Sequence, residues 1–463
     1  MGDGIERALV LRSDDGRGAE SQPSIPDHLC NADSWISEEE MPNRPQYDVA
    51  IVGASIAGCT AAILFARKGA RVALIERDPD PAAYKKICTH FIQSSATPTI
   101  ERLGLADAIE AAGGIRNDFE VFTRWGWIVP PPTRNVTRPA YGYNIRRETL
   151  DPVVRKHAIA TPGVDFMPGF TARELLVSRN RFSGVLIHGA DGLQKEIQAR
   201  LVVGADGRQT RIAELAGLAA KVKPNGRFSR FAHYRNLPLR SGLRSQLWLL
   251  EPDIAFILPN DDGITVVAAM PERAKLAVWK ADPEGAMHRL FDSLPNAPPL
   301  RKAERVSPFM GMNEIPNKIR KVFKPGLALV GDAALAIDPL WGVGCGWAFQ
   351  SAEWLAEATG NSLHRSDKLD RGLEAYGRRH RFELAAHEFL ISDFSTGRGY
   401  NPIERLMYSA AARDTVCADH VLAFGSRCIG VAAFLNPLAL ARAIWVNARH
   451  AMGANVTGNR QLH

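Results

Sequence analysis

The segment 47–76, YDVAIVGASIAGCTAAILFARKGARVALIE, most strongly constrains the fold of this chain. Its run 48–52 is short, apolar and rich in β-branched residues, as expected for a buried parallel strand. A glycine turn at 53–58 and a helical composition over 57–68 follow. A second strand is predicted at 71–75. The order strand, glycine turn, helix and strand predicts a βαβ unit of Rossmann type.

The glycine turn carries the features of a dinucleotide site. Gly53 permits the tight bend, Gly58 lets the helix pack close to the strand, and Ser55 stands where the fingerprint usually has its second glycine. Glu76, 18 residues past Gly58, suits a bidentate contact with two ribose hydroxyls. The first amides of the helix would hold a pyrophosphate. The alternative is a structural βαβ unit without a ligand.

Composition is ordinary for a globular protein. The 463 residues are 46% hydrophobic and 23% charged, and the net charge of +7 is too mild to argue for nucleic acid. It indicates a solvated surface, or a bias that attracts anionic cofactors or substrates. No run of 18 or more apolar residues appears, so no membrane span is predicted. The chain is long enough for two or three domains.

The N-terminal residues and the cysteines bear on location. Residues 1–46 are polar and acidic, without the pattern of a signal peptide, and we predict a disordered extension. The six cysteines form neither a CxxC pair nor a zinc spacing. We therefore expect reduced thiols in a cytoplasmic protein, with no metal site.

Two further motifs follow along the chain. GADG (204–207) comes directly after a predicted strand at 201–203. GDAALAIDPLWGVGCG (331–346) comes after a buried strand at 327–330 and opens a helix to Ala358. A helix that begins in such a glycine-rich turn presents unpaired amides and a positive dipole end.

These three motifs, in this order and at this spacing, resemble those of the flavoprotein monooxygenases of the para-hydroxybenzoate hydroxylase fold class. That superfamily also contains flavin-dependent halogenases and geranylgeranyl reductases. The resemblance covers about 47–358 and implies an FAD site. It also implies an α/β fold, with a Rossmann-type FAD-binding domain, an antiparallel β-sheet substrate domain and a helical C-terminal region.

The expected domains are an N-terminal extension (1–46), a discontinuous FAD-binding domain (47–220 and 301–366), a substrate domain (221–300) and a helical region (367–463). The FAD-binding domain includes an aromatic hairpin within 118–143 and a β-meander at 171–203. Strands at 245–250, 254–259 and 264–270 indicate the substrate sheet. The C-terminal region would pack against the flavin domain or close the substrate pocket; a partner or membrane-surface contact is the alternative.

The resemblance implies roles for particular residues. Glu76 would bind the adenosine ribose, Asp206 would support the flavin, and Asp332 would bind the ribityl chain. Arg147 would lie near the phosphates or ribityl chain, although an exposed helix cation is the alternative. The full predicted set for the cofactor is Gly53, Ser55, Ile56, Ala57, Gly58, Glu76, Arg77, Arg147, Asp206, Asp332, Pro339, Gly342, Gly344, Cys345 and Gly346.

The resemblance implies that the turn before the helix of the third motif faces the flavin. Its amides would stabilise the anionic reduced flavin, and its glycines would allow close approach. Gly346 stands where many hydroxylases have asparagine. Cys345 is either a thiol near the flavin or a small packed residue.

Candidates for acid–base chemistry are few. His90 follows Glu76 in a loop that approaches the flavin in this superfamily, and His233 falls in a predicted strand of the substrate domain. A structural role is the alternative for both. Lys86 and Cys88 lie where the reductases carry a lysine- and cysteine-containing glycine motif, but Thr89 and His90 replace its glycines. Lys85 or Lys86 would be the nearby candidate for a halogenase lysine.

The resemblance implies an FAD-dependent oxidoreductase, a monooxygenase that uses NAD(P)H. It would hydroxylate or epoxidise an apolar or aromatic small molecule through a flavin hydroperoxide, in secondary metabolism for example. No separate nicotinamide fingerprint appears, so a partner flavin reductase is the other electron source. The alternatives are a reductase of carbon–carbon double bonds, a flavin-dependent halogenase and a non-catalytic escort of prenylated proteins. The substrate and the oligomeric state stay open.

Overall fold

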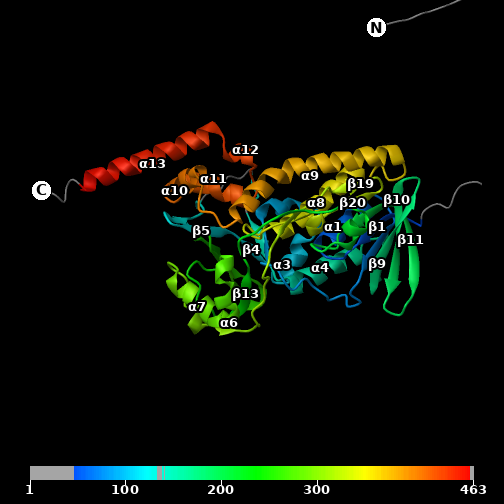
Figure 1. Cartoon of the computed structure of the whole chain (residues 1–463), viewed down its shortest axis with the longest axis horizontal. Helices are drawn as coiled ribbons and strands as arrows, with labels where there is room; N and C mark the ends of the chain where they lie inside the picture. Colours follow the sequence, from blue (N-terminus) through cyan, green and yellow to red (C-terminus); the bar gives the residue numbers. More distant parts are fainter. Residues whose placement is uncertain (1–45, 133–137, 140, 459–463) are drawn as a thin grey trace, which may run out of the picture. The chain divides into compact units, whose positions relative to one another are not determined.

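The computed structural model describes residues 46–132, 138–139 and 141–458 (Figure 1). The predicted N-terminal extension lies outside the described residues, apart from Gln46. The described chain carries a parallel sheet covered by helices, a mixed, largely antiparallel sheet and a run of C-terminal helices. This arrangement confirms the predicted fold class.

The first sheet brings the three sequence motifs to one edge. Its path runs β19-β20-β11-β1-β2-β8, and β9 and β10 extend it by antiparallel pairing from β11. β1 pairs in parallel with β11, and β11 with β20, so that Val52 is opposite Gly204, and Gly204 is opposite Leu329. Because these strands run in the same direction, the turns that follow them meet at the carboxyl edge of the sheet. The strands are β1 (Tyr47–Val52), β2 (Val72–Glu76), β8 (Val164–Pro168), β9 (Phe170–Ser178), β10 (Arg181–Gly189), β11 (Gln194–Gly204), β19 (Phe323–Lys324) and β20 (Leu327–Leu329).

Helices pack against the parallel sheet. α1 (Ile56–Arg67) is buried on nearly all sides because it contacts both α4 (Arg147–Ile159) and α8 (Val343–Thr359). A helix that is apolar around most of its surface is suited to such a position. α9 (Ser366–Phe394) lies along α8 (Figure 1).

The second sheet has the order β17-β13-β16-β15-β14-β5-β6. Its members β5 and β6 come from the predicted aromatic hairpin, and β5 pairs in parallel with β14. Trp248 on this sheet packs with Met287 and Phe291 of α7 in a separate apolar core. The elements are β5 (Phe119–Thr123), β6 (Gly126–Ile128), β13 (Arg230–Arg235), β14 (Ser245–Leu249), β15 (Ile254–Pro259), β16 (Thr265–Met270), β17 (Glu304–Arg305), α6 (Leu276–Ala281) and α7 (Pro283–Ser293).

Short elements connect the two sheets. One small sheet has the order β3-β7-β4 and another the order β12-β18-β21. Their bounds, with those of the short helices nearby, are β3 (Phe91–Ile92), β4 (Ile115–Asn117), β7 (Gly142–Asn144), β12 (Lys221–Lys223), β18 (Asn317–Ile319), β21 (Leu335–Ala336), α2 (Thr97–Arg102), α3 (Ala106–Ala111), α5 (Arg211–Leu215), η2 (Ser94–Ala96), η3 (Asp261–Gly263), η4 (Arg273–Lys275), η5 (Leu300–Lys302) and η6 (Gly331–Ala333).

The C-terminal region is helical, as predicted. After α9 come α10 (Pro402–Ala411), α11 (Thr415–Gly425), α12 (Val431–Phe434) and α13 (Pro437–Gly458). α10 contacts both α11 and α13. Among the described residues, no helix combines the length and the apolar character needed to cross a membrane.

Candidate functional site

The turn after β1 admits only glycine at its two ends. Gly53 has φ +104°, and a Cβ there would lie 2.6 Å from the carbonyl oxygen of Ala205. A Cβ on Gly58 would lie 1.8 Å from the carbonyl oxygen of Gly53. Ser55, the residue before α1, makes no side-chain cap to the helix. The amides of the first turn therefore remain suited to an anionic ligand.

Glu76 lies beside this turn at the end of β2. Its Oε2 accepts a hydrogen bond from the Ala54 amide at 2.7 Å, and its Oε1 accepts one from the Asp78 amide at 3.1 Å. The carboxylate is thus held next to the start of α1, where a ribose could meet it. The neighbouring Arg77, also predicted to contact the cofactor, is exposed to solvent.

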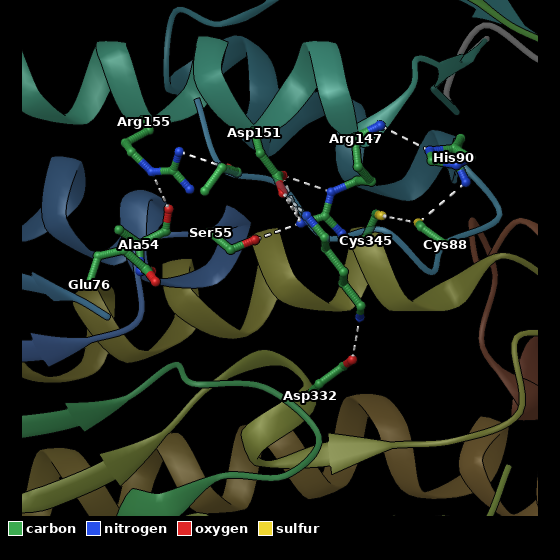
Figure 2. A network of polar contacts seen from close by, with 12 residues as sticks. Ala54, Ser55, Glu76, Cys88, His90, Arg147, Asp151, Arg155, Asp332 and Cys345 are labelled. Atoms are coloured by element: carbon green, nitrogen blue, oxygen red, sulfur yellow. Dashed lines mark hydrogen bonds and ion pairs between the residues drawn. The ribbon is translucent and has the colours of Figure 1, made fainter. Parts of the chain in front are cut away.

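Three side chains of α4 line the other side of the turn (Figure 2). Arg147 and Asp151 are 3% and 1% exposed, and Arg147 Nε donates to Asp151 Oδ1 at 2.7 Å. Arg147 Nη2 also donates to Ser55 Oγ at 2.6 Å. Arg155 Nε donates to the carbonyl oxygen of Ala54 at 3.0 Å. Arg147 is therefore a buried residue of the site, not an exposed helix cation.

Asp151 and Arg155 were missed by the sequence reasoning, although a signal was present. Arg147, Asp151 and Arg155 follow one another at four-residue spacing, which places them on one face of a helix. Burial alone lowers the pKa of Arg147, but nearby negative charge, that of Asp151 first, outweighs it and raises the pKa. The guanidinium is a permanent positive charge in the site.

The loop after β2 crosses from α4 to the third motif. The Lys85 amide donates to Asp151 Oδ2 at 3.0 Å, and Lys85 Nζ donates to Asp332 Oδ2 at 2.8 Å. Burial raises the pKa of Asp332, yet Lys85, with Arg208 and Arg147, outweighs burial and lowers it. Asp332 is an ionised acceptor at neutral pH. Its ion-pair partner Lys85 is one of the two lysines considered for halogenase chemistry.

The backbone amides at the start of α8 have no side-chain cap. Gly342, the residue before the helix, has φ +62° and provides no side-chain cap. Gly344 is exposed, and a Cβ there would meet only Asp332 Oδ1 within 4 Å, at 3.8 Å. Asp338 fixes the preceding turn, because its Oδ1 accepts from the Leu340 amide at 2.9 Å and its Oδ2 accepts from Arg227 Nη2 at 2.9 Å.

Asp206 of the second motif binds the first turn of α5. Its Oδ2 accepts hydrogen bonds from the amides of Arg211 at 2.7 Å and Ile212 at 3.1 Å. Burial raises the pKa of this carboxyl group. Its Oδ1 is buried and has no hydrogen-bond partner among the described residues. Asp206 therefore fixes the start of α5 and retains one open acceptor.

The two predicted acid–base residues meet in space. The rings of His90 and His233 lie with their centroids 5.4 Å apart and edge to face. His90 is 2% exposed, and its Nδ1 accepts from the Arg147 amide at 2.9 Å, which leaves the proton of the neutral ring on Nε2. The Nε2 atoms of both histidines are buried without a partner in the part of the chain that is described. Burial is the main cause that lowers the pKa of each, so both are neutral at pH 7.

A mainly apolar pocket adjoins the loop after β2 and the start of α8. Its lining includes residues of β14 and β15 from the second sheet, together with Thr89, Trp341 and Gly342. Its apolar lining is provided largely by Phe91, Phe119, Phe256, Leu258, Leu340 and Trp341. Such a pocket suits an apolar or aromatic small molecule.

Gln93 joins the pocket to the C-terminal helices. Its Nε2 donates to the carbonyl oxygens of Trp341 at 2.9 Å and Gly425 at 2.7 Å. The loop after β2, the turn before α8 and the end of α11 are therefore held together. No local sequence pattern indicates these contacts, because the partners of Gln93 lie far away along the chain.

The donor set fits FAD. The glycine turn and the uncapped start of α1 could hold a pyrophosphate. The uncapped start of α8 could hold a flavin edge, and the ionised Asp332 could hold a polyol chain. Among the described residues, no group of three or more His, Cys, Asp or Glu side chains could hold a metal ion. Fold and site together define a Rossmann-type flavoprotein.

Comparison with known families agrees. The model of the FAD binding domain family matches residues 46–382, and the chain belongs to this family. It is a member of the para-hydroxybenzoate hydroxylase fold superfamily and an FAD-dependent enzyme of the oxidoreductase type.

Relatives in this superfamily differ in their reactions. The chain is 24% identical to digeranylgeranylglycerophospholipid reductase 2 of Methanothermobacter thermautotrophicus, over 80% of this chain and 93% of the relative. It is 26% identical to kynurenine 3-monooxygenase of Salinispora arenicola, over 82% of this chain and 85% of the relative. The structure of the flavin-dependent brominase Bmp2 superposes with a TM-score of 0.71 at 18% identity, covering 87% of this chain and 99% of the brominase.

Proposed function

We propose that the protein is a monooxygenase that uses FAD and NAD(P)H to insert one oxygen atom into an apolar or aromatic small molecule. The observation that carries this proposal is the apolar pocket between the second sheet and the start of α8. Oxygen insertion needs a site from which water is excluded, and an apolar substrate bound against this aromatic lining would contribute to that exclusion.

FAD would be held by residues of this chain that already converge. The turn Gly53–Gly58 and Arg147 would meet its phosphates, Glu76 its adenosine ribose, and Asp332 its ribityl chain, after exchanging Lys85 for hydroxyl groups. The first turn of α8, from Gly342 to Gly346, would meet the flavin ring. Bound FAD supplies oxygen activation with electrons from NAD(P)H, and the protein supplies position and shielding.

The paired histidines would serve the substrate. His90 presents its Nε2 proton as a donor, fixed by the hydrogen bond from the Arg147 amide to Nδ1. Because His233 is also neutral at pH 7, its ring nitrogens offer an acceptor as well as a donor. The Nε2 atoms are buried and neither ring lines the apolar pocket, so the pair would orient a hydroxyl or carbonyl group of the substrate only where that group extends from the pocket to the two rings.

Reduction of a carbon–carbon double bond is the second candidate. It is favoured by the alignment that spans 93% of a named reductase, and an apolar pocket suits an isoprenoid chain as well as an aromatic ring. Fold alone cannot choose between the two reactions, because oxygenases, reductases and halogenases share it.

An oxygen electrode tests the proposal. Purified protein with FAD and NADH or NADPH is screened against apolar and aromatic compounds in halide-free buffer. We expect a substrate to accelerate dioxygen uptake and to lower the share of dioxygen that appears as hydrogen peroxide. Product formation that continues under anaerobic conditions would favour the reductase instead. If NAD(P)H is not consumed until a separate flavin reductase is added, the electrons come from a partner.

A further inference from the structure

Two cysteines from distant parts of the chain meet beside the candidate flavin site. Cys88 lies in the loop between β2 and β3, and Cys345 lies in the first turn of α8. Their Sγ atoms are 3.7 Å apart, although 257 positions separate the residues in the sequence (Figure 2). The thiols are in direct contact and share one hydrogen bond.

The surroundings of Cys88 favour a thiolate. Its Sγ accepts a hydrogen bond from the His90 amide at 3.3 Å, and the positive charges of Arg147 and Lys85 act on it. The hydrogen bond from Cys345 is the largest cause that lowers the pKa of Cys88, and those two cations add to it. The same contact raises the pKa of Cys345. A thiolate is the nucleophile in disulfide exchange, so Cys88 is the attacking group.

The two thiols also differ in solvent exposure, and Cys88 is again the more reactive one. Cys88 is half-buried, whereas Cys345 is 6% exposed. An external reagent therefore reaches Cys88 first, and Cys345 is placed to react with whatever forms there. This division into an accessible low-pKa thiol and a neighbouring resolving thiol is typical of redox-sensing cysteine pairs.

The other described cysteines have different neighbours. Cys59 is fully buried, and burial raises its pKa. Cys417 is also buried, and burial raises its pKa to about 11. The sulfur of Cys428 lies 3.5 Å from the hydroxyl of Ser94, and it is half-buried like Cys88. Cys428 is therefore a control of similar exposure whose sulfur contacts serine hydroxyls instead of a second thiol.

We propose that Cys88 and Cys345 form a reversible disulfide with low-molecular-weight disulfides as the oxidant. The Cys88 thiolate attacks the external disulfide, forms a mixed disulfide and releases one small thiolate. Cys345 then gives up its proton and attacks Sγ of Cys88, which forms the internal disulfide and releases the second small thiol. Two protein thiols are oxidised, and one external disulfide is reduced to two thiols.

The bond requires the two sulfur atoms to move closer together. A disulfide has a sulfur–sulfur distance of about 2.05 Å, so the 3.7 Å contact must shorten by about 1.7 Å. Residues 77–90 contain no helix or strand and can supply that movement. The bond would tie this loop to the start of α8 and remove the thiolate charge beside Arg147 and Lys85. The inference goes beyond the proposed reaction and does not depend on it.

Differential alkylation tests the pair. The reduced full-length protein, supplemented with FAD, is equilibrated anaerobically in glutathione buffers of increasing oxidised fraction and then quenched with acid and alkylated. Peptide mass analysis should find the Cys88 and Cys345 peptides linked, with a mass lower by two hydrogen atoms, and reversed by dithiothreitol. Cys345→Ser should instead stop at a glutathione adduct on Cys88.

Controls separate the pair from general thiol oxidation. Cys428→Ser should retain the linked peptides, and Cys88→Ser should leave Cys345 unmodified because it is buried. The proposal is overturned if Cys88 and Cys345 stay fully alkylated at glutathione ratios that already modify Cys428. It is also overturned if Cys345→Ser accumulates no adduct on Cys88. Both readouts are masses, so a failure of the proposed oxygenase reaction would not affect them.

Discussion

Replacing Gly344 with alanine separates contact with the cofactor from stability of the fold. The added Cβ would meet only Asp332 Oδ1 at 3.8 Å, an ordinary contact, and otherwise points into open space. Because alanine is the better helix former, the apoprotein should gain up to about 0.5–1 kcal/mol. If the flavin approaches this backbone, the methyl group costs about 1–3 kcal/mol of overpacking. FAD should then bind about 5- to 150-fold more weakly.

The assay combines a fluorescence titration of apoprotein with FAD and urea unfolding of the apoprotein. Gly430→Ala is the control, since a Cβ there meets nothing within 4 Å and its φ of −81° suits alanine. Gly58→Ala gives the opposite pattern, because its Cβ would lie 1.8 Å from a carbonyl oxygen and must damage the turn itself. Unchanged FAD affinity in Gly344→Ala would refute the assignment of the start of α8 to the flavin.

Two further predictions concern buried charge. Arg147→Met should lower the free energy of unfolding by about 3–5 kcal/mol in urea, because Asp151 is left buried without its partner. The double variant Arg147→Met/Asp151→Leu should recover most of that loss. Equal losses in both variants would argue against the pair. Burial, followed by the charge of Arg427, lowers the pKa of His380 and of His387 to about 4. Unfolded histidine takes up its proton near pH 6.5, so stability is present above that pH and falls by about 2 kcal/mol for each histidine by pH 5. Replacing both histidines with glutamine should flatten this pH dependence, and a flat wild-type profile between pH 7 and pH 5 would contradict the reasoning.

Local pattern was enough to predict the first unit of the fold. The apolar run before Gly53 and the spacing from Gly58 to Glu76 specify a strand, a turn and a helix within one short segment, and the structure has all of them. The discontinuous parallel sheet followed from the order of the three motifs. The structure places their turns at one edge because β1, β11 and β20 are parallel and in register.

Contacts between distant segments could not be predicted in the same way. The parallel pairing of β5 with β14 puts the aromatic hairpin into the second sheet, and no local periodicity encodes that partner. His90 and His233 were named separately, and only the fold brings their rings together. The contact of Cys88 with Cys345 likewise lacks any CxxC spacing. Arg155 is an exception, since its four-residue spacing from Asp151 was visible along the helix.

The domain boundaries and the roles of the cofactor residues stay predictions. Arg77 and Asp206 show why proximity alone is not enough to assign them. Arg77 follows Glu76 directly but is exposed. One carboxylate oxygen of Asp206 accepts hydrogen bonds from the backbone of α5. Titration of variants at these two positions with FAD would assign them.

The most direct test of the account is the mass of the product formed under isotopically labelled dioxygen. A compound that accelerates oxygen uptake is incubated with the protein, FAD and NAD(P)H under ¹⁸O₂, and the product is compared with that formed under ordinary dioxygen. If the protein is a monooxygenase, the product carries one ¹⁸O atom. A product that has gained two hydrogen atoms or a halogen, with no ¹⁸O, would contradict it.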